Sequence, residues 1–292
     1  MANESPAPEG GCWQLTVAYD GGAFWGSQRQ PNRRTVQSVL EQALSDLAGV
    51  HIGTVFAGRT DRGVHAMGQA VSCARVGPVL CRLGDLALTQ AVNARLPVDV
   101  AVAEVRRRPV GFHARYDAIW REYRYRVWCG GPQPLARHTV WQRARGLDRQ
   151  AMEAAAAMLI GRHDFAAFAS GGVGVPWSTW RERPRGTVRT VLRCSVRPVP
   201  PMWELDADGP GEGYEIRVVA DGFLPRMVRG IVGALVEIGR GARPVEWMGE
   251  LRQAADRRGG PPTAPAHGLV LWRIGYDDDV PAADEITLRA TG

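Results

Sequence analysis

The sequence predicts an α+β fold made of two tandem ferredoxin-like halves, each with the order β-α-β-β-α-β and an antiparallel sheet. Three observations predict it. The chain has 292 residues, a length that suits two ordinary domains. Segments with the two-residue alternation of strands are interleaved with segments whose apolar residues have helical spacing. The same order of segments occurs twice, so a pseudo-duplicated protein with its site in a central cleft is expected.

The first half is expected to contain a strand, a helix, two strands, a helix and a strand. Alternation marks the outer strands, Thr35 is a typical N-terminal cap of the first helix, and the turn Gly58–Gly63 separates the two middle strands. The expected segments are 13–20, a helix from Thr35 to Leu47, 54–57, 65–75, 83–94 and 98–105.

The second half repeats this order with one extra helix. Its clearest signal is strict alternation over 119–128, which places Tyr123 and Tyr125 on one face and Glu122 and Arg124 on the other. Prolines indicate where the two later helices begin. The remaining segments are a helix over 148–161, strands near 187–197 and 214–220, helices opening at Pro225 and Pro244, and a strand over 269–276.

These segments divide the chain into two domains and two tails. We expect a flexible tail over 1–12, an N-terminal domain over 13–108, a C-terminal domain over 109–276 and an acidic tail over 277–292. A stretch rich in Gly, Pro and Arg, residues 170–186, predicts a mobile loop.

Composition excludes several classes of protein. Hydrophobic residues are 45% and charged residues 23%, which is typical of a folded domain. No window reaches the roughly 18 apolar residues of a membrane span. The first residues lack the pattern of a signal peptide, so a cytoplasmic protein is expected.

The chain has no lysine, so all 36 basic residues are arginine and the net charge is +6. Schiff-base chemistry, a P-loop and a protein-kinase site each require a lysine and are excluded. The planar guanidinium group of arginine forms paired hydrogen bonds with phosphates and stacks on bases, which suggests a nucleic-acid partner. Genome composition is the alternative explanation of the arginine content.

Metal and nucleotide sites are not predicted. The five cysteines are scattered without a C-x-x-C pair, and the histidines show no ligand spacing. Two glycine-rich stretches fail to complete G-x-G-x-x-G because Trp177 and Tyr214 occupy the last position. We therefore expect no metal and no cofactor.

Asp61 is the strongest candidate for a reactive residue. Glycines bracket it in a turn between two strands, and Arg59 and Arg62 flank it. Guanidinium charge keeps a nearby carboxylate ionised, which suits a nucleophile or a general base. The alternative is an aspartate that only caps the turn and forms a surface ion pair.

Two further groups also allow two interpretations. Tyr123 and Tyr125 share a strand face with Arg121, as a base-stacking platform requires, although such tyrosines are more often part of a core. Arg229 lies in an apolar helix, where an unpaired guanidinium is costly to bury. It either points to solvent or has an anionic partner.

From about Tyr19 to Tyr276 the chain resembles the TruA family of tRNA pseudouridine synthases. The signature around the nucleophile is present as Gly58-Arg59-Thr60-Asp61 with Gly63-Val64-His65-Ala66 and Gly68-Gln69. Other matching segments are Tyr19-Asp20-Gly21 with Phe24, Gly26, Gln28 and Gln30, Thr35-Val36-Gln37, Asn93 with Leu96-Pro97, Phe112-His113-Ala114-Arg115, Arg121-x-Tyr123-x-Tyr125, His163-Asp164-Phe165 with Phe168, Met227-Val228-Arg229 with Ile231-Val232-Gly233, and Gly268-Leu269.

The resemblance implies a role for each of five residues. Asp61 would be the catalytic aspartate and Arg229 its ion-pair partner. Tyr123 would be a catalytic residue that stacks on the target uracil, orients it and helps to remove its C5 proton. Arg59 would help to extrude the target nucleotide, and Leu269 would wall the base pocket.

Four positions depart from the family pattern. Ser27 stands where a tryptophan is usual, Arg62 where a small residue is common, and Gly230 where asparagine usually follows the arginine. Pro225 lies in the stretch before Met227. These departures concern local packing and RNA contacts.

The resemblance implies isomerisation of uridine to pseudouridine at positions 38, 39 and 40 of the tRNA anticodon stem-loop, without a cofactor. It also implies a homodimer in which one tRNA spans both subunits. Three alternatives stay open: a synthase acting on another RNA, an RNA-binding protein without activity, and a glycosidase that releases free base. The last would need a second working carboxylate, and none is evident near Asp61.

Overall fold

A computed structural model describes residues 12–73, 80, 83–143, 145–170, 186–200, 211–254, 256 and 258–276. Both predicted tails, apart from Cys12, and residues 171–185 of the predicted loop lie outside the described residues. No helix in the described ranges is long and apolar enough to cross a membrane.

The first half has the predicted element order. It consists of β1 (Cys12–Tyr19), the 3-10 turn η1 (Gly21–Ala23), α1 (Val36–Ala48), β2 (Val55–Phe56), β3 (His65–Cys73), α3 (Asp85–Asn93) and β4 (Val100–Arg108). Thr35 caps α1 as expected: its hydroxyl accepts a hydrogen bond from the Ser38 N–H, and the Ser38 side chain accepts one from the Thr35 N–H.

The second half also has the predicted order, with additions. It consists of β5 (Trp120–Gly130), η2 (Pro134–Ala136), β6 (Trp141–Arg143), α4 (Arg149–Ala157), β7 (Gly161–Asp164), η3 (Ala166–Phe168), β8 (Val188–Val199), β9 (Gly211–Ala220), α5 (Met227–Gly239), α6 (Trp247–Ala254), η4 (Ala266–Gly268) and β10 (Leu269–Gly275). The sequence did not indicate β6 or β7, which have only three and four residues and no buried position.

Some helix ends differ from the prediction. α5 begins at Met227, not at Pro225, because Arg226 adopts a left-handed conformation with φ 59°. α4 ends at Ala157, not Gly161, and α6 begins at Trp247, three residues after Pro244. The prolines therefore marked the neighbourhood of the helix starts and not their first residues.

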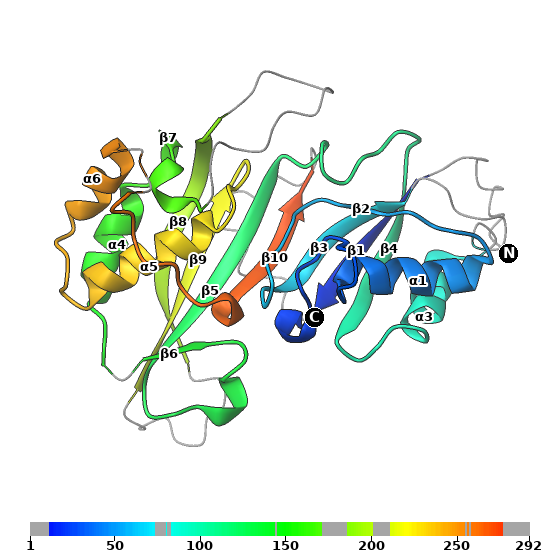
Figure 1. Ribbon diagram of the computed structural model, residues 1–292, viewed down its shortest axis with the longest axis horizontal. Coiled ribbons are helices and arrows are strands. Elements are labelled where there is room, and N and C mark those ends of the chain that lie inside the picture. The colour runs from blue at the N-terminus through cyan, green and yellow to red at the C-terminus, as the bar shows by residue number, and fades with distance from the viewer. Residues whose placement is uncertain are drawn as a thin grey trace, which may run out of the picture.

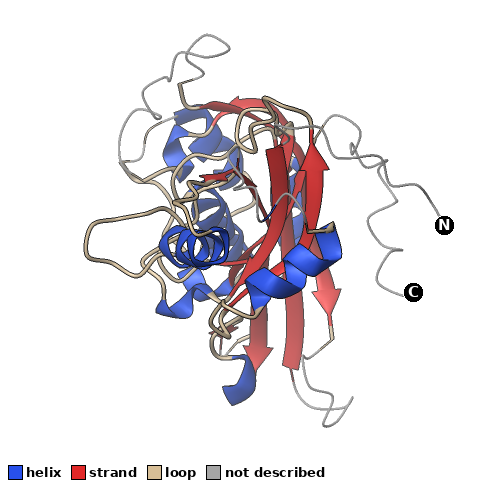
Figure 2. Ribbon diagram, turned by 90° about the vertical axis from the view of Figure 1, so that its right-hand side faces the viewer, coloured by secondary structure: helices blue, strands red, loops and turns tan. Residues whose placement is uncertain are grey.

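The α+β class and the tandem ferredoxin-like order are confirmed. Strands follow the order β4-β1-β3-β10-β5-β9-β8-β7, with β2 paired to β3 and β6 to β5. Within each half the strands have the 4-1-3-2 arrangement, β4-β1-β3-β2 and β10-β5-β9-β8. Most of the helices lie on one face of the sheet (Figure 2).

The two halves share one sheet instead of forming two. β10 lies between β5 and β3 (Figure 1), antiparallel to the former and parallel to the latter. Val270 pairs with His65 and Leu271 with Ala66. β10 therefore joins the strand that follows Asp61 to the strand that carries Tyr123. The division into domains at residue 108 stays a prediction.

The face of β5 opposite to Tyr123 is buried although it carries charges. Glu122 and Glu215 are both 0% exposed. Arg124 and Arg217 lie 2.8 and 2.7 Å from Glu122, and Arg197 lies 2.6 Å from Glu215. Carboxylates so far from water are tolerated because they are surrounded by guanidinium groups.

Candidate active site

Asp61 lies at the tip of the loop between β2 and β3. The Val64 N–H donates to the Asp61 carbonyl at 3.1 Å, and Gly63 takes a positive φ of 80° that closes this turn. The Asp61 side chain is 43% exposed. The loop thus presents the carboxylate to solvent and does not bury it.

One end of the loop is held by a buried amide. The Gln69 side chain, 0% exposed, donates from Nε2 to the Gly58 carbonyl at 2.7 Å and accepts from the Gly58 N–H at 3.1 Å. A side-chain amide can replace both hydrogen bonds of a strand neighbour in this way. Gly58 is therefore fixed three residues before the aspartate.

The residue directly before Asp61 is held by three hydrogen bonds. The Thr60 N–H donates to Ser27 Oγ at 2.9 Å, and the Ser27 N–H donates to the Thr60 carbonyl at 3.1 Å. Thr60 Oγ1 and the Tyr19 hydroxyl share a hydrogen bond of 2.8 Å. Burial raises the pKa of Tyr19 to about 12, so this phenol is neutral near neutral pH. These contacts fix the backbone from which Asp61 projects.

Arg229 reaches Asp61 from the first turn of α5. Its Nη1 lies 3.5 Å from Asp61 Oδ2, and its Nε donates to the Ala264 carbonyl at 2.7 Å. Burial lowers the pKa of Arg229, and the negative charge of Asp61 opposes that effect. Of the two alternatives for Arg229, the structure therefore shows the anionic partner.

Tyr123 lies beside this pair on β5. Its side chain is 7% exposed and meets Phe223 edge to face at 5.0 Å and 85°. Burial raises the pKa of Tyr123, and the nearby Tyr19 and Asp61 raise it further. The phenol is therefore neutral and is a poor source of a phenolate base.

Tyr125 and Arg121 have structural contacts instead of a stacking surface. Tyr125 is 0% exposed and donates its hydroxyl proton to the Pro265 carbonyl at 2.9 Å. Arg121 donates to the carbonyls of Ala118, Asp221 and Arg115 at 2.8–3.0 Å. Tyr125 is therefore part of the core. The Arg121 guanidinium is engaged by three backbone carbonyls.

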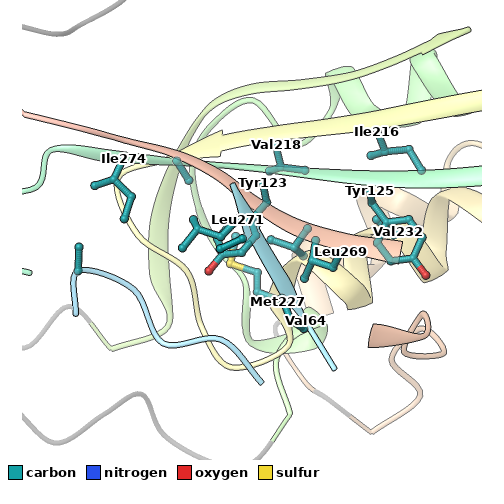
Figure 3. Packing of buried hydrophobic residues seen from close by; sticks show 14 of the residues in the cluster. Val64, Tyr123, Tyr125, Ile216, Val218, Met227, Val232, Leu269, Leu271 and Ile274 are labelled. Atoms are coloured by element: carbon teal, nitrogen blue, oxygen red, sulfur yellow. The ribbon is translucent and has the colours of Figure 1, made fainter. Parts of the chain in front are cut away.

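Leu269 begins β10 and lines the apolar side of the site. It is 5% exposed, and Figure 3 shows it with Leu271, Met227 and Val64 beside Tyr123. A Cβ on the preceding Gly268 would lie 2.5 Å from the Tyr125 ring, so only glycine lets β10 approach β5 here.

Arg59 is exposed two residues before Asp61. Partial burial and the neighbouring Arg115 charge lower its pKa. Among the described residues no carboxylate forms an ion pair with Arg59. Its charge is free to meet an anionic ligand.

Three of the four positions expected to depart from the family pattern have defined contacts in the structure. Ser27 is 0% exposed and holds Thr60, and the Pro225 carbonyl accepts from the Ser170 N–H at 3.0 Å. A Cβ at Gly230 would lie 2.4 Å from the Phe168 carbonyl, so a larger side chain would not fit this packing.

Sequence reasoning gave no role to Gln69, Phe223 or the Ser27 hydroxyl. A glutamine in a strand of small residues is a weak signal of a buried amide, and Phe223 precedes α5 as one aromatic among many. Among the described residues no group of three or more His, Cys, Asp or Glu could hold a metal ion.

A sequence profile of the tRNA pseudouridine synthase family matches residues 15–117 and 155–277. The chain is 39% identical over 270 residues to "tRNA pseudouridine synthase A" of Ralstonia nicotianae, covering 90% of this chain and 89% of that protein. It is 42% identical over 268 residues to the protein of the same name from Chloroflexus aurantiacus, covering 90% and 87%. A relative from Syntrophotalea carbinolica with that name is 39% identical over 264 residues, covering 90% and 95%.

The family match and the named relatives identify an isomerase of the pseudouridine synthase class that acts on tRNA. The chain belongs to the tRNA pseudouridine synthase family. The resemblance stated from sequence motifs is thereby confirmed.

We expect Ser27→Ala to lower turnover by about tenfold or more. The variant leaves the Thr60 N–H without its partner at a buried position, which costs about 1–3 kcal/mol and lets the Asp61 backbone shift. Steady-state kinetics measure the effect. Ser45→Ala is the matched control, because Ser45 Oγ accepts from the Ile52 N–H on the far side of α1. An equal loss of turnover in both variants would show that Ser27 acts only through general stability.

Proposed function

We propose that this protein isomerises uridine to pseudouridine at positions 38, 39 and 40 of the tRNA anticodon stem-loop, using Asp61 and no cofactor. The observation that carries the proposal is the Asp61 carboxylate 3.5 Å from the Arg229 guanidinium in a chain of this family. In this reaction the N1–C1′ bond breaks, the uracil rotates, C5 bonds to C1′, the C5 proton is released to water and N1 takes up a proton, so that the product is an isomer of the substrate.

Asp61 is the group that reacts. An exposed carboxylate on a fixed loop can attack C1′ of the ribose, add to C6 of the uracil, or accept a proton from the ribose. The target base must leave the RNA stack to reach it. Arg229, tied to the Ala264 carbonyl, holds the carboxylate in one orientation through a charge-assisted contact.

The remaining residues position the base. The Tyr123 ring lies against the uracil and orients it, and the raised pKa of the phenol argues against a role as a phenolate base. Leu269 forms the apolar wall. Arg59, exposed and without a carboxylate partner in the described chain, fills the place of the extruded nucleotide.

Two parts of the proposal have their support in the family alone. The choice of positions 38–40 follows the resemblance, and the named relatives are tRNA pseudouridine synthases. A homodimer that binds one tRNA across both subunits is proposed on the same ground. A cytoplasmic location and a cleft between the two halves are proposed on the sequence arguments given above.

The test uses tRNA transcripts tritiated at uracil C5, with no added metal or nucleotide. The protein is expected to release one tritium per target uridine into water without free uracil, and sequencing of the product should place pseudouridine at 38–40. Release of free uracil would indicate a glycosidase. Modification of another RNA only would move the proposal to that substrate, and no release from any RNA would overturn it.

Binding of tRNA should weaken steeply with salt. The chain carries a net charge of +6 supplied wholly by arginine, and each phosphate contact adds about 0.7–0.9 to the slope of log affinity against log salt. Filter binding between about 50 and 200 mM salt measures this slope. A slope near zero would exclude multiple phosphate contacts.

A further inference from the structure

Two arginine side chains stack on one tryptophan beside the Asp61 loop. The Cζ atoms of Arg33 and Arg62 lie 3.8 and 3.9 Å from the centroid of the Trp25 ring. Arg62 directly follows Asp61 in the chain. Both arginines are exposed, and Trp25 is half-buried. Guanidinium groups stack well on indole, so Trp25 orders two cations next to the reacting carboxylate.

These two cations differ from their neighbours in having no acidic partner among the described residues. Arg29 forms an ion pair with Glu41, and Arg34 contacts Asp99 through two hydrogen bonds of 2.7 and 2.8 Å. Within the described ranges no carboxylate forms an ion pair with Arg33 or Arg62. Two like charges on one ring repel each other, and a bound anion would relieve the repulsion.

The stack is fixed to the Asp61 loop. The Trp25 N–H donates to the Arg34 carbonyl at 3.0 Å, and Gln30 donates to the Trp25 carbonyl at 2.7 Å. At Gly26, the next residue, a Cβ would lie 3.5 Å from the Asp61 carbonyl carbon and 3.6 Å from the Arg62 nitrogen. The two segments are therefore in contact, and the backbone that carries Trp25 packs against the backbone that carries Asp61 and Arg62.

We propose that Arg33, Trp25 and Arg62 form a phosphate clamp for the RNA strand next to the target nucleotide. This inference rests on the proposed function. The guanidinium groups cover the Trp25 ring, so the ring does not stack on a base. The clamp therefore binds the RNA phosphate backbone irrespective of the RNA sequence. Their planar forks match phosphate oxygens, and the fixed stack lowers the entropy cost of binding.

The first test compares Arg33→Gln, Arg62→Gln and the double variant with the unchanged protein. Each single substitution should raise the KM for tRNA about tenfold, the scale of one charge-assisted hydrogen bond, and Arg33→Gln should change kcat little at saturating tRNA. The salt slope of tRNA affinity should fall by about 0.7–0.9 for each arginine removed. Arg149→Gln is the matched control, because Arg149 pairs with Glu153 on α4, and its KM and slope should not change.

Trp25→Leu tests the contribution of the stacking platform separately from the charges of Arg33 and Arg62. It keeps both arginines but removes the platform, so affinity should fall while the salt slope stays. Arg33 lies in an exposed loop, so Arg33→Gln should not affect folding. This single variant therefore decides the test if the double variant is unstable. An unchanged KM and salt slope in Arg33→Gln, with tritium release by the unchanged protein, would overturn the clamp and leave the function standing. Absence of tritium release by the unchanged protein would instead overturn the function.

Discussion

Asp61→Asn is expected to abolish tritium release while tRNA affinity stays nearly unchanged. Asparagine has the size of aspartate but is neither a nucleophile nor a base, so chemistry stops. The side chain is 43% exposed and its loop is held through Gly58 and Thr60, so the fold should tolerate the change. Arg229 keeps its hydrogen bond to Ala264 and stays in place.

Single-turnover tritium release and filter binding measure the two effects separately. Asp61→Ala should behave like Asp61→Asn, and the pair of variants guards against deamidation of the asparagine. Asp46→Asn on α1, whose carboxylate accepts from Gln42, is the control for loss of one exposed carboxylate. Residual turnover above about a few per cent in Asp61→Ala would show that the carboxylate does not react, because loss of a reacting group costs several orders of magnitude.

Local signals predicted the elements but not how they join. Alternation over 119–128 and the Thr35 cap depend on neighbouring residues, and β5 and α1 lie close to their expected ranges. The parallel pairing of β10 with β3 joins residues about 200 positions apart, and no local pattern encodes it. Only the structure therefore reveals that the two halves share one sheet.

The site shows the same division. The turn that carries Asp61 is formed by consecutive residues, so local sequence signals predict it. The contact between Asp61 and Arg229 joins residues 168 positions apart. Sequence chemistry alone left Arg229 with two interpretations, and only family resemblance chose between them. The Ser27 hydroxyl could not be predicted to hold Thr60, because a serine in a loop has many possible partners.

Glu215→Gln is expected to lower the free energy of unfolding by about 3–5 kcal/mol at pH 7, as removal of one partner from a buried ion pair does. Glu215 is 0% exposed and contacts Arg197, Arg126 and Arg124 at 2.6, 3.2 and 3.5 Å. Glutamine keeps the shape but leaves these cations without a counter-charge. Urea denaturation measures the loss. Glu153→Gln, in an exposed pair with Arg149, should cost less than about 1 kcal/mol.

The effect should also depend on pH. Burial alone would raise the pKa of Glu215, but the Arg197 hydrogen bond and the charges of Arg124 and Arg126 outweigh burial and hold it below its ordinary value of 4.5. A carboxyl with a lower pKa in the folded state binds fewer protons there than in the unfolded chain. Its stabilisation is therefore complete above pH 4.5 and is lost as the pH falls through the folded-state value. The difference between the unchanged protein and Glu215→Gln should shrink in that acid range, and a difference that stays constant would show that the negative charge of Glu215 is not what stabilises the folded protein.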